Sequence, residues 1–236
     1  MSSAWKAAAD VLAADLRALF RERLSSVVAY GPSVEDGGAG EPVTCLALVT
    51  SLGADDLDAC ARQMTGWKRQ GLATPLIMPA AEFLRSLDAF PLEYSEIIRT
   101  HVRVFGDDPF AQASVAPDDL RRACETQVKS HLLHLREGYM ATAARPQAVA
   151  SLVAESAPAF TALLRNVARL HGVSTTDRPD ATLQGGRLAG LPDGPVRAML
   201  ALERREQQGT VDGSRIFPEY LAAVEQLAKF VDSWRQ

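Results

Sequence analysis

Cysteine is scarce in this chain of 236 residues, and its three cysteines lie far apart. Cys45, Cys60 and Cys124 form no CxxC pair, so the pattern predicts neither a zinc site nor a disulfide framework. A sparse, odd set of cysteines in apolar surroundings is typical of a reducing compartment. We therefore expect a cytoplasmic protein.

The sequence also lacks a long uncharged apolar run. Charged residues interrupt each apolar stretch before it reaches the roughly 20 residues that cross a membrane. Near the start of the chain, Lys6, Asp10 and Asp15 are incompatible with the apolar centre of a signal peptide. We expect neither a membrane partner nor a cleaved leader.

Positive charge is not in excess. The chain has 25 Lys and Arg against 29 Asp and Glu, which gives a formal net charge of -4. A general nucleic-acid-binding protein needs a clustered basic surface, whereas Arg121-Arg122 and Arg204-Arg205 are short and flanked by acidic residues. We expect no general nucleic-acid binding. The length allows one large domain or two small ones.

Strands and helices alternate in the first half of the chain. The apolar spacing predicts helices at 4–23, 55–69 and 79–87, and strands at 26–30, 43–50 and 74–78. Val43–Thr50 is apolar almost throughout, which predicts a central strand covered on both faces. Pro91–Arg103 contains residues typical of a strand. Gly31-Pro32-Ser33 is predicted to be a tight turn, and Glu35–Glu41 a glycine-rich loop.

After Pro117 the strand pattern stops. Helical spacing recurs over 118–139, over 146–170, where Pro158 should kink or divide the helix, over short pieces within 183–208, and over 216–234. We therefore predict an α+β N-terminal domain over residues 1–112, with a mixed sheet flanked by helices. An all-α helical bundle should follow over residues 117–236.

Several segments carry, by their order, a resemblance to a known family. They are Val27–Ser33 after a helix, the strand Val43–Thr50, the segment Phe90–Pro109, and the helical pieces Leu132–Tyr139 and Pro158–Arg165. This order resembles the nucleotidyltransferase superfamily, in its kanamycin-nucleotidyltransferase-like two-domain branch. The resemblance implies a nucleotidyltransferase-like N-terminal domain before the helical bundle.

The resemblance also implies a nucleotide site. In the family a Gly-Ser turn holds the triphosphate, because backbone N–H groups and a hydroxyl suit phosphate oxygens. Gly31-Pro32-Ser33 matches this turn, with a proline between the usual pair. Gly31 and Ser33 are therefore the candidate nucleotide-binding residues. A plain turn that ends a strand is the alternative for the same three residues.

The family further places two aspartates one residue apart on the next strand and a third carboxylate on a neighbouring strand. These carboxylates hold Mg²⁺ and activate the attacking hydroxyl. Thr44 and Leu46 stand at the positions of the two aspartates, and Glu93 matches the third carboxylate. Glu93 is the candidate catalytic residue, with a solvated strand-end carboxylate as the alternative. No residue is assigned as a metal ligand.

Three functions follow from this pattern. The first is a nucleotidyltransferase fold without catalysis that binds a nucleotide, small ligand or protein partner in a cleft between the halves. The second is an active enzyme that uses Mg²⁺ and a nucleoside triphosphate to transfer a nucleoside monophosphate to a hydroxyl. There, Glu35, Asp36 or Glu41 would replace the missing carboxylates. The third is a non-catalytic homodimer built on the helical half. Thr44 and Leu46 favour the first.

Two histidines in the helical half have the spacing of metal ligands. His131 and His134 lie three residues apart on a predicted helix. No Cys, Asp or Glu occupies a matching position on that helix face. Partly buried helix histidines without a metal are the alternative.

Overall fold

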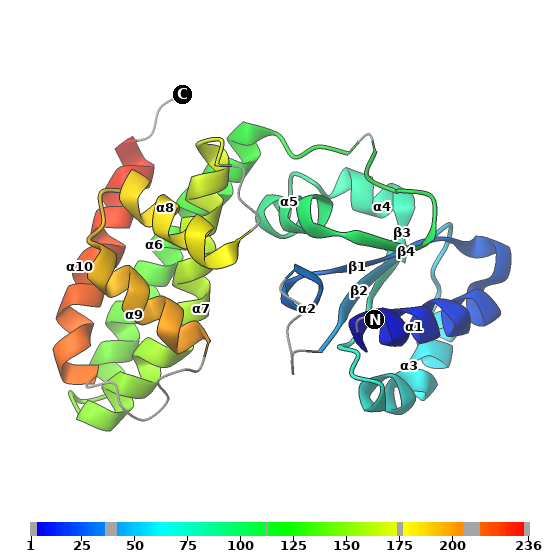
Figure 1. The fold of residues 1–236 in the computed structure, drawn as a ribbon, viewed down its shortest axis with the longest axis horizontal. Helices are drawn as coiled ribbons and strands as arrows, with labels where there is room; N and C mark the ends of the chain where they lie inside the picture. Colours follow the sequence, from blue (N-terminus) through cyan, green and yellow to red (C-terminus); the bar gives the residue numbers. More distant parts are fainter. Residues whose placement is uncertain (1–3, 36–41, 112, 174–176, 205–212, 234–236) are drawn as a thin grey trace. The chain divides into compact units, whose positions relative to one another are not determined.

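A computed structural model describes residues 4–35, 42–111, 113–173, 177–204 and 213–233 (Figure 1). The chain divides into two compact units, residues 1–116 and 117–236, each with a core of its own. The first contains a mixed sheet with flanking helices, and the second is helical. The predicted fold class is therefore confirmed.

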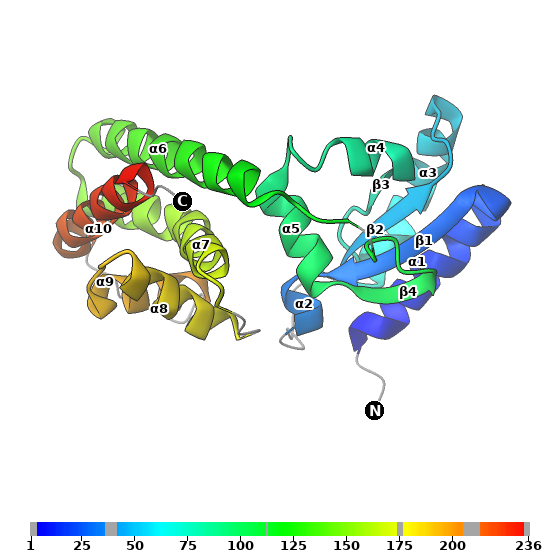
Figure 2. The ribbon, with the colours of Figure 1, turned by 90° about the horizontal axis from the view of Figure 1, so that it is seen from above.

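Four strands form the sheet of the first unit (Figure 2). They are β1 (Leu24–Tyr30), β2 (Thr44–Val49), β3 (Leu76–Pro79) and β4 (Val102–Gly106), in the order β3-β2-β1-β4. β1 is antiparallel to both β2 and β4, whereas β2 and β3 are parallel. A parallel pair requires a crossover connection, and helix α3 (Ala54–Arg69) supplies it.

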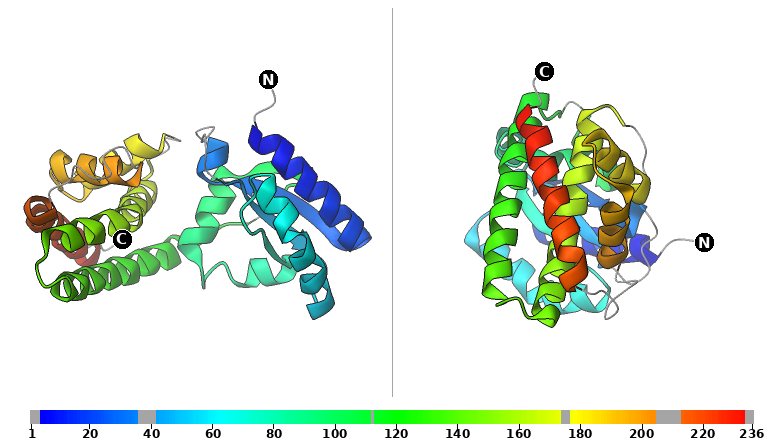
Figure 3. Two further views of the ribbon diagram at one scale, coloured as in Figure 1. Left: turned by 90° about the horizontal axis from the view of Figure 1, so that it is seen from below. Right: turned by 90° about the vertical axis from the view of Figure 1, so that its left-hand side faces the viewer.

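One face of the sheet is covered by α1 (Ala4–Phe20) and α3, which lie side by side (Figure 3). A short 3-10 turn, Arg21–Arg23, joins α1 to β1. Alternate strand residues such as Val27, Ala47 and Val49 pack against the apolar stripes of both helices. The indole N–H of Trp67 donates a hydrogen bond of 2.9 Å to Asp15 Oδ2, so the buried ring keeps its polar atom paired.

The opposite face of the sheet packs against α4 (Ala80–Arg85) and α5 (Pro91–Thr100). Its buried cluster comprises Val28, Leu46, Leu48, Met78, Phe83, Tyr94, Ile97 and Phe110. The rings of Phe83 and Tyr94 lie 4.6 Å apart between their centroids. β2 is thus covered on both faces, as its nearly continuous apolar sequence predicts.

The strand predicted over Pro91–Arg103 is wrong for most of its length. Residues 91–100 form α5, and β4 begins only at Val102. Buried residues recur every third position in α5, at Pro91, Tyr94, Ile97 and Thr100, which is a helical repeat. A proline at the first helical position also favours this start. The β-branched isoleucines therefore fill a helix face.

The tight turn predicted after β1 takes the form of a single helical turn. Gly31 has a φ of 85°, and Pro32 then begins the one-turn helix α2 (Pro32–Glu35). Proline suits this first position because its ring presets the helical φ. The loop predicted over Glu35–Glu41 lies outside the described residues, apart from the backbone of Glu35.

The second unit contains α6 (Pro117–Ala141), α7 (Pro146–Leu170), α8 (Arg178–Leu188), α9 (Asp193–Glu203) and α10 (Gly213–Ser233). Helix α7 packs against each of the other four, and α6 and α10 lie side by side (Figure 3). Pro158 lies inside α7 without dividing it.

Helix α7 is long and apolar enough to cross a membrane by length and composition alone. Its position explains this composition, because Val153, Phe160 and Leu164 are fully buried in the core of the second unit. A core helix of a folded domain passes the same test. We therefore interpret its apolar character as packing.

Candidate functional site

The turn after β1 contains a buried hydroxyl without a partner. Ser33 is only 3% exposed, and its Oγ has no hydrogen-bond partner among the described residues. A backbone hydrogen bond closes this turn: the Val34 N–H donates to the Gly31 carbonyl at 3.0 Å. The positive φ of Gly31 favours glycine at this position. The turn therefore offers a polar group that the surrounding protein leaves unsatisfied.

Thr44 and Leu46, at the positions matched to the family's two aspartates, lie on one face of β2. Thr44 is opposite Tyr30 and Leu46 is opposite Val28 in the antiparallel pairing with β1. Directly opposite residues point to the same face of a sheet. Leu46 is 0% exposed within the apolar cluster beneath α4 and α5, whereas Thr44 is half-buried at the end of the strand.

The strands on either side of β2 carry no carboxylate. β3 reads Leu-Ile-Met-Pro, and β1 reads Leu-Ser-Ser-Val-Val-Ala-Tyr. Leu46 pairs with Leu76 in the parallel register with β3. Within these strands, no acidic side chain shares a sheet face with Thr44 and Leu46.

Glu93, the candidate catalytic residue, does not lie on a strand. It occupies the first turn of α5, where its side chain is exposed and the positive end of the helix dipole favours its charge. Its match to a carboxylate on a neighbouring strand is therefore wrong in position. Its catalytic role stays a prediction.

The residues described around the turn do not fit a Mg²⁺ ion. Mg²⁺ binds oxygen ligands in near-octahedral geometry, usually with one or two carboxylates. Thr44 supplies one neutral oxygen and Leu46 supplies none. No group of three or more His, Cys, Asp or Glu within the described ranges could hold a metal. The side chain of Glu35, and Asp36 and Glu41 entirely, lie outside those ranges.

A further residue at this end of the strands was not singled out from the sequence. Tyr30 precedes Gly31 and lies opposite Thr44, half-buried. Burial raises the pKa of Tyr30, with smaller contributions from Cys45 and Tyr94, so its hydroxyl stays neutral. Its place before the turn is the one sequence signal that points to it. Tyr30, Ser33 and Thr44 thus bring three neutral hydroxyls to the region where β1 ends and β2 begins.

Comparisons with known proteins identify a solved structure with a similar fold. No protein-family model matches the sequence, and no curated protein matches it. Among solved structures, the chain is similar to the spectinomycin adenyltransferase AAD(9) from Enterococcus faecialis, crystallised with ATP and spectinomycin. The TM-score is 0.61 at 12% sequence identity, over 94% of this chain and 97% of that chain. The chain has a nucleotidyltransferase-like fold.

In the helical unit, the two histidines whose spacing suggested a metal site have different surroundings. His131 is half-buried, and its Nε2 lies 2.7 Å from the hydroxyl of Tyr220. His134 is exposed, and its Nδ1 lies 3.3 Å from Glu137. Because the two rings have different partners and different exposure, their geometry favours packing roles over a shared metal.

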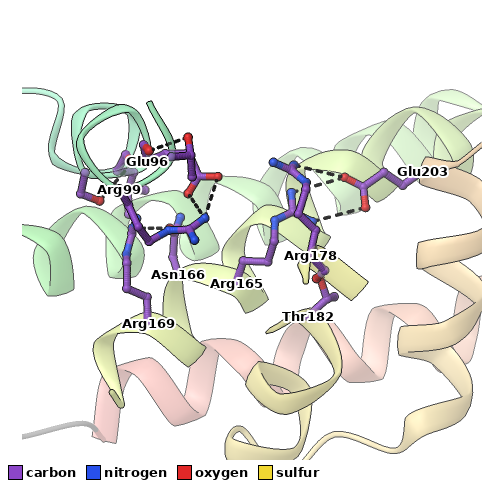
Figure 4. Close-up of polar contacts among 11 residues, drawn as sticks. Glu96, Arg99, Arg165, Asn166, Arg169, Arg178, Thr182 and Glu203 are labelled. Carbon is purple, nitrogen blue, oxygen red and sulfur yellow. Dashed lines mark hydrogen bonds and ion pairs between the residues drawn. The ribbon is translucent and has the colours of Figure 1, made fainter. Parts of the chain in front are cut away.

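The same unit contains a partly buried charged cluster that joins three helices (Figure 4). Arg165 of α7 contacts Glu203 of α9 at 3.3 and 3.4 Å, and Arg178 of α8 approaches the same carboxylate at 3.9 Å. The hydroxyl of Thr182 lies 3.4 Å from Arg165. Elsewhere on α7, Arg169 donates to Asn166. The cluster fixes α8 and α9 against α7.

Proposed function

We propose that this protein is a nucleotidyltransferase-fold protein without metal-dependent transfer that binds a nucleotide through its phosphates, independently of Mg²⁺. The observation that carries the proposal is the complete burial of Leu46 on the sheet face where the family places a carboxylate. A similar fold in an enzyme crystallised with ATP supports the class of ligand.

The loss of metal chemistry follows from packing. Leu46 contributes to an apolar core with Val28 and Tyr94, where a charged group without a partner would cost several kcal/mol. The adjoining strands offer no carboxylate to share a cation. A divalent ion on this face would therefore exchange its hydration shell for too few oxygen ligands.

The binding of phosphate follows from the turn. The Ser33 hydroxyl is buried and has no partner among the described residues, which is unfavourable unless a bound group completes its hydrogen bonding. A Cβ on Gly31 would meet no described atom within 4 Å, so there is space beside this buried backbone position. A phosphate oxygen accepts from both hydroxyl and amide donors. The neutral hydroxyls of Tyr30 and Thr44 lie on the strands that flank this turn.

The test is calorimetric titration of the whole chain with ATP, once with EDTA and once with Mg²⁺. We expect binding in both conditions with similar affinity. Ser33→Ala should weaken binding about tenfold, since a hydrogen bond to a charged group contributes roughly 1.5–3 kcal/mol. Ser51→Ala, an exposed serine beyond β2, is the matched control and should change nothing.

Two outcomes would overturn the proposal. The first is binding that requires Mg²⁺, or no binding in either condition. The second is release of pyrophosphate from ATP with Mg²⁺ and a hydroxyl acceptor, which would show an active transferase. Loss of that release in Glu93→Gln, or in variants of Glu35, Asp36 and Glu41, would identify the carboxylates responsible.

A further inference from the structure

A cavity opens in the first unit, beside the start of β1. Its volume is about 230 Å³. It is lined by Ser25 and Ser26 of β1, Leu48 of β2, Ala80, Phe83 and Leu84 of α4, and Asp107 and Pro109 after β4. Gly31 and Ser33 follow the other end of the same strand. The cavity therefore does not include the turn at Gly31 and Ser33 that is proposed to bind a nucleotide.

The polar group inside this cavity wall is Ser26. Its side chain is 3% exposed, and its Oγ has no hydrogen-bond partner among the described residues. Ser26 is directly opposite Leu48 in the antiparallel pairing, so both side chains point to the face covered by α4. The unsatisfied hydroxyl is thus on the cavity side of the sheet.

The pairing of β1 with its neighbours is irregular near Ser26. The pairing of β1 with β2 shifts between Leu24 and Ser26, which leaves Ser25 as an extra residue. On the other side, a Cβ on Gly106 would lie 2.1 Å from the carbonyl oxygen of Ser25, so only glycine permits this close approach. Strand bulges commonly occur where a side chain is redirected next to a binding site.

The charge at the cavity comes from one carboxylate. Asp107 is exposed and has no hydrogen bond or ion pair within the described part of the chain. Its neighbour Asp108 is engaged, because its Oδ1 accepts from the Phe110 N–H at 2.9 Å and lies 3.3 Å from His101 Nε2. Asp107 therefore remains available to a cation, beside apolar walls formed by Leu48 and Leu84.

We propose that this cavity binds a small organic cation, with its apolar body against Leu48, Phe83 and Leu84 and its protonated amine between the Asp107 carboxylate and the Ser26 hydroxyl. The amine donates to both oxygens. The volume limits the ligand to a small molecule about the size of one aromatic ring with a short arm. The site does not depend on the proposed nucleotide binding.

The experiment is a titration of the ¹⁵N-labelled whole chain with benzylamine, followed by amide chemical shifts. Benzyl alcohol and benzoate are the neutral and anionic controls of the same shape. We expect benzylamine to shift the amides of Ser25, Ser26, Leu84 and Asp107, and to bind about fivefold more tightly than benzyl alcohol. Benzoate should bind most weakly.

Variants assign the two polar contacts. Asp107→Asn should remove the preference for the amine over the alcohol, whereas Asp88→Asn, the same charge change at an exposed site outside the cavity, should keep it. Ser26→Ala should weaken benzylamine binding without lowering the thermal stability of the ligand-free protein. Equal binding of all three probes, shifts confined to other residues, or no shifts would overturn the proposal.

Discussion

The hydroxyl oxygen of Tyr220 lies 2.7 Å from Nε2 of His131 and joins α10 to α6 inside the helical unit. The imidazole also stacks near Phe160, with 6.3 Å between the ring centroids. Burial, with a smaller contribution from His134, lowers the pKa of His131 to about 4. The folded protein therefore holds this histidine in its neutral form.

This contact predicts a loss of stability in mild acid. The pKa of His131 falls from 6.5 to about 4 on folding, so between these values the unfolded chain binds a proton that the folded chain does not. The free energy of unfolding should be highest above pH 6.5 and fall by up to about 3 kcal/mol as the pH approaches 4. Urea unfolding measured across this range checks the slope. His131→Gln should flatten it, while His134→Gln, which removes only the smaller contribution, should change it little.

A carboxylate at position 46 should destabilise the first unit. Leu46→Asp places a charge in the fully buried cluster beneath α4 and α5, with an expected loss of at least about 4 kcal/mol in the free energy of unfolding. Thr44→Asp, at a half-buried position, should cost less than about 1.5 kcal/mol. Urea denaturation of the two variants measures the difference. A Leu46→Asp protein as stable as the parent would contradict the packing described for this face.

The close approach of α8 to α7 depends on a glycine. A Cβ on Gly185 would lie 1.9 Å from the carbonyl oxygen of Leu164, a backbone atom that cannot rotate away. Gly185→Ala should therefore lower the stability of the helical unit by about 3 kcal/mol. Gly194→Ala is the matched control, because a Cβ there meets nothing within 4 Å, and its effect should stay within about 1 kcal/mol. Equal melting temperatures for the two variants would argue against this contact.

An ion pair links the 3-10 turn after α1 to α3. The guanidinium of Arg23 donates two hydrogen bonds to Asp56, at 2.8 and 2.7 Å, and these lower the pKa of that carboxyl to about 2, helped by the Gly53 N–H. The stabilisation is present above the ordinary pKa of 3.8 and is lost as the pH falls toward 2. In an NMR titration, Arg23→Gln should return the Asp56 pKa toward 3.8. Arg62→Gln, an exposed change elsewhere on α3, should not.

Much of the fold could be predicted from local pattern. β1 and β2 are short segments bounded by turn residues, and the burial of β2 on both faces is evident from its nearly continuous apolar sequence. The error at α5 arose because Ile97 and Ile98 favour strands by composition, while the burial repeat and Pro91 specify a helix. Propensity is weaker than packing in such a segment.

The candidate site was predictable only in part. Gly31 and Ser33 could be found from the turn, but the burial of the Ser33 hydroxyl depends on how the chain packs around it. Glu93 lies in the first turn of α5 and not on a strand, and its catalytic role, which the family resemblance implies, stays a prediction. The cavity near Ser26 had no sequence signal, since it is formed by α4 and by the residues after β4.

The filled face around Leu46 has a consequence for how this chain can change. A single acidic substitution is disfavoured there, because a lone aspartate would contact Val28, Met78 and Tyr94 before any cation could offset its burial. Several neighbours would have to change together, and each intermediate would fold less well. Hydrophobic packing of this kind makes it hard for a charged metal ligand to arise at this position by single substitutions.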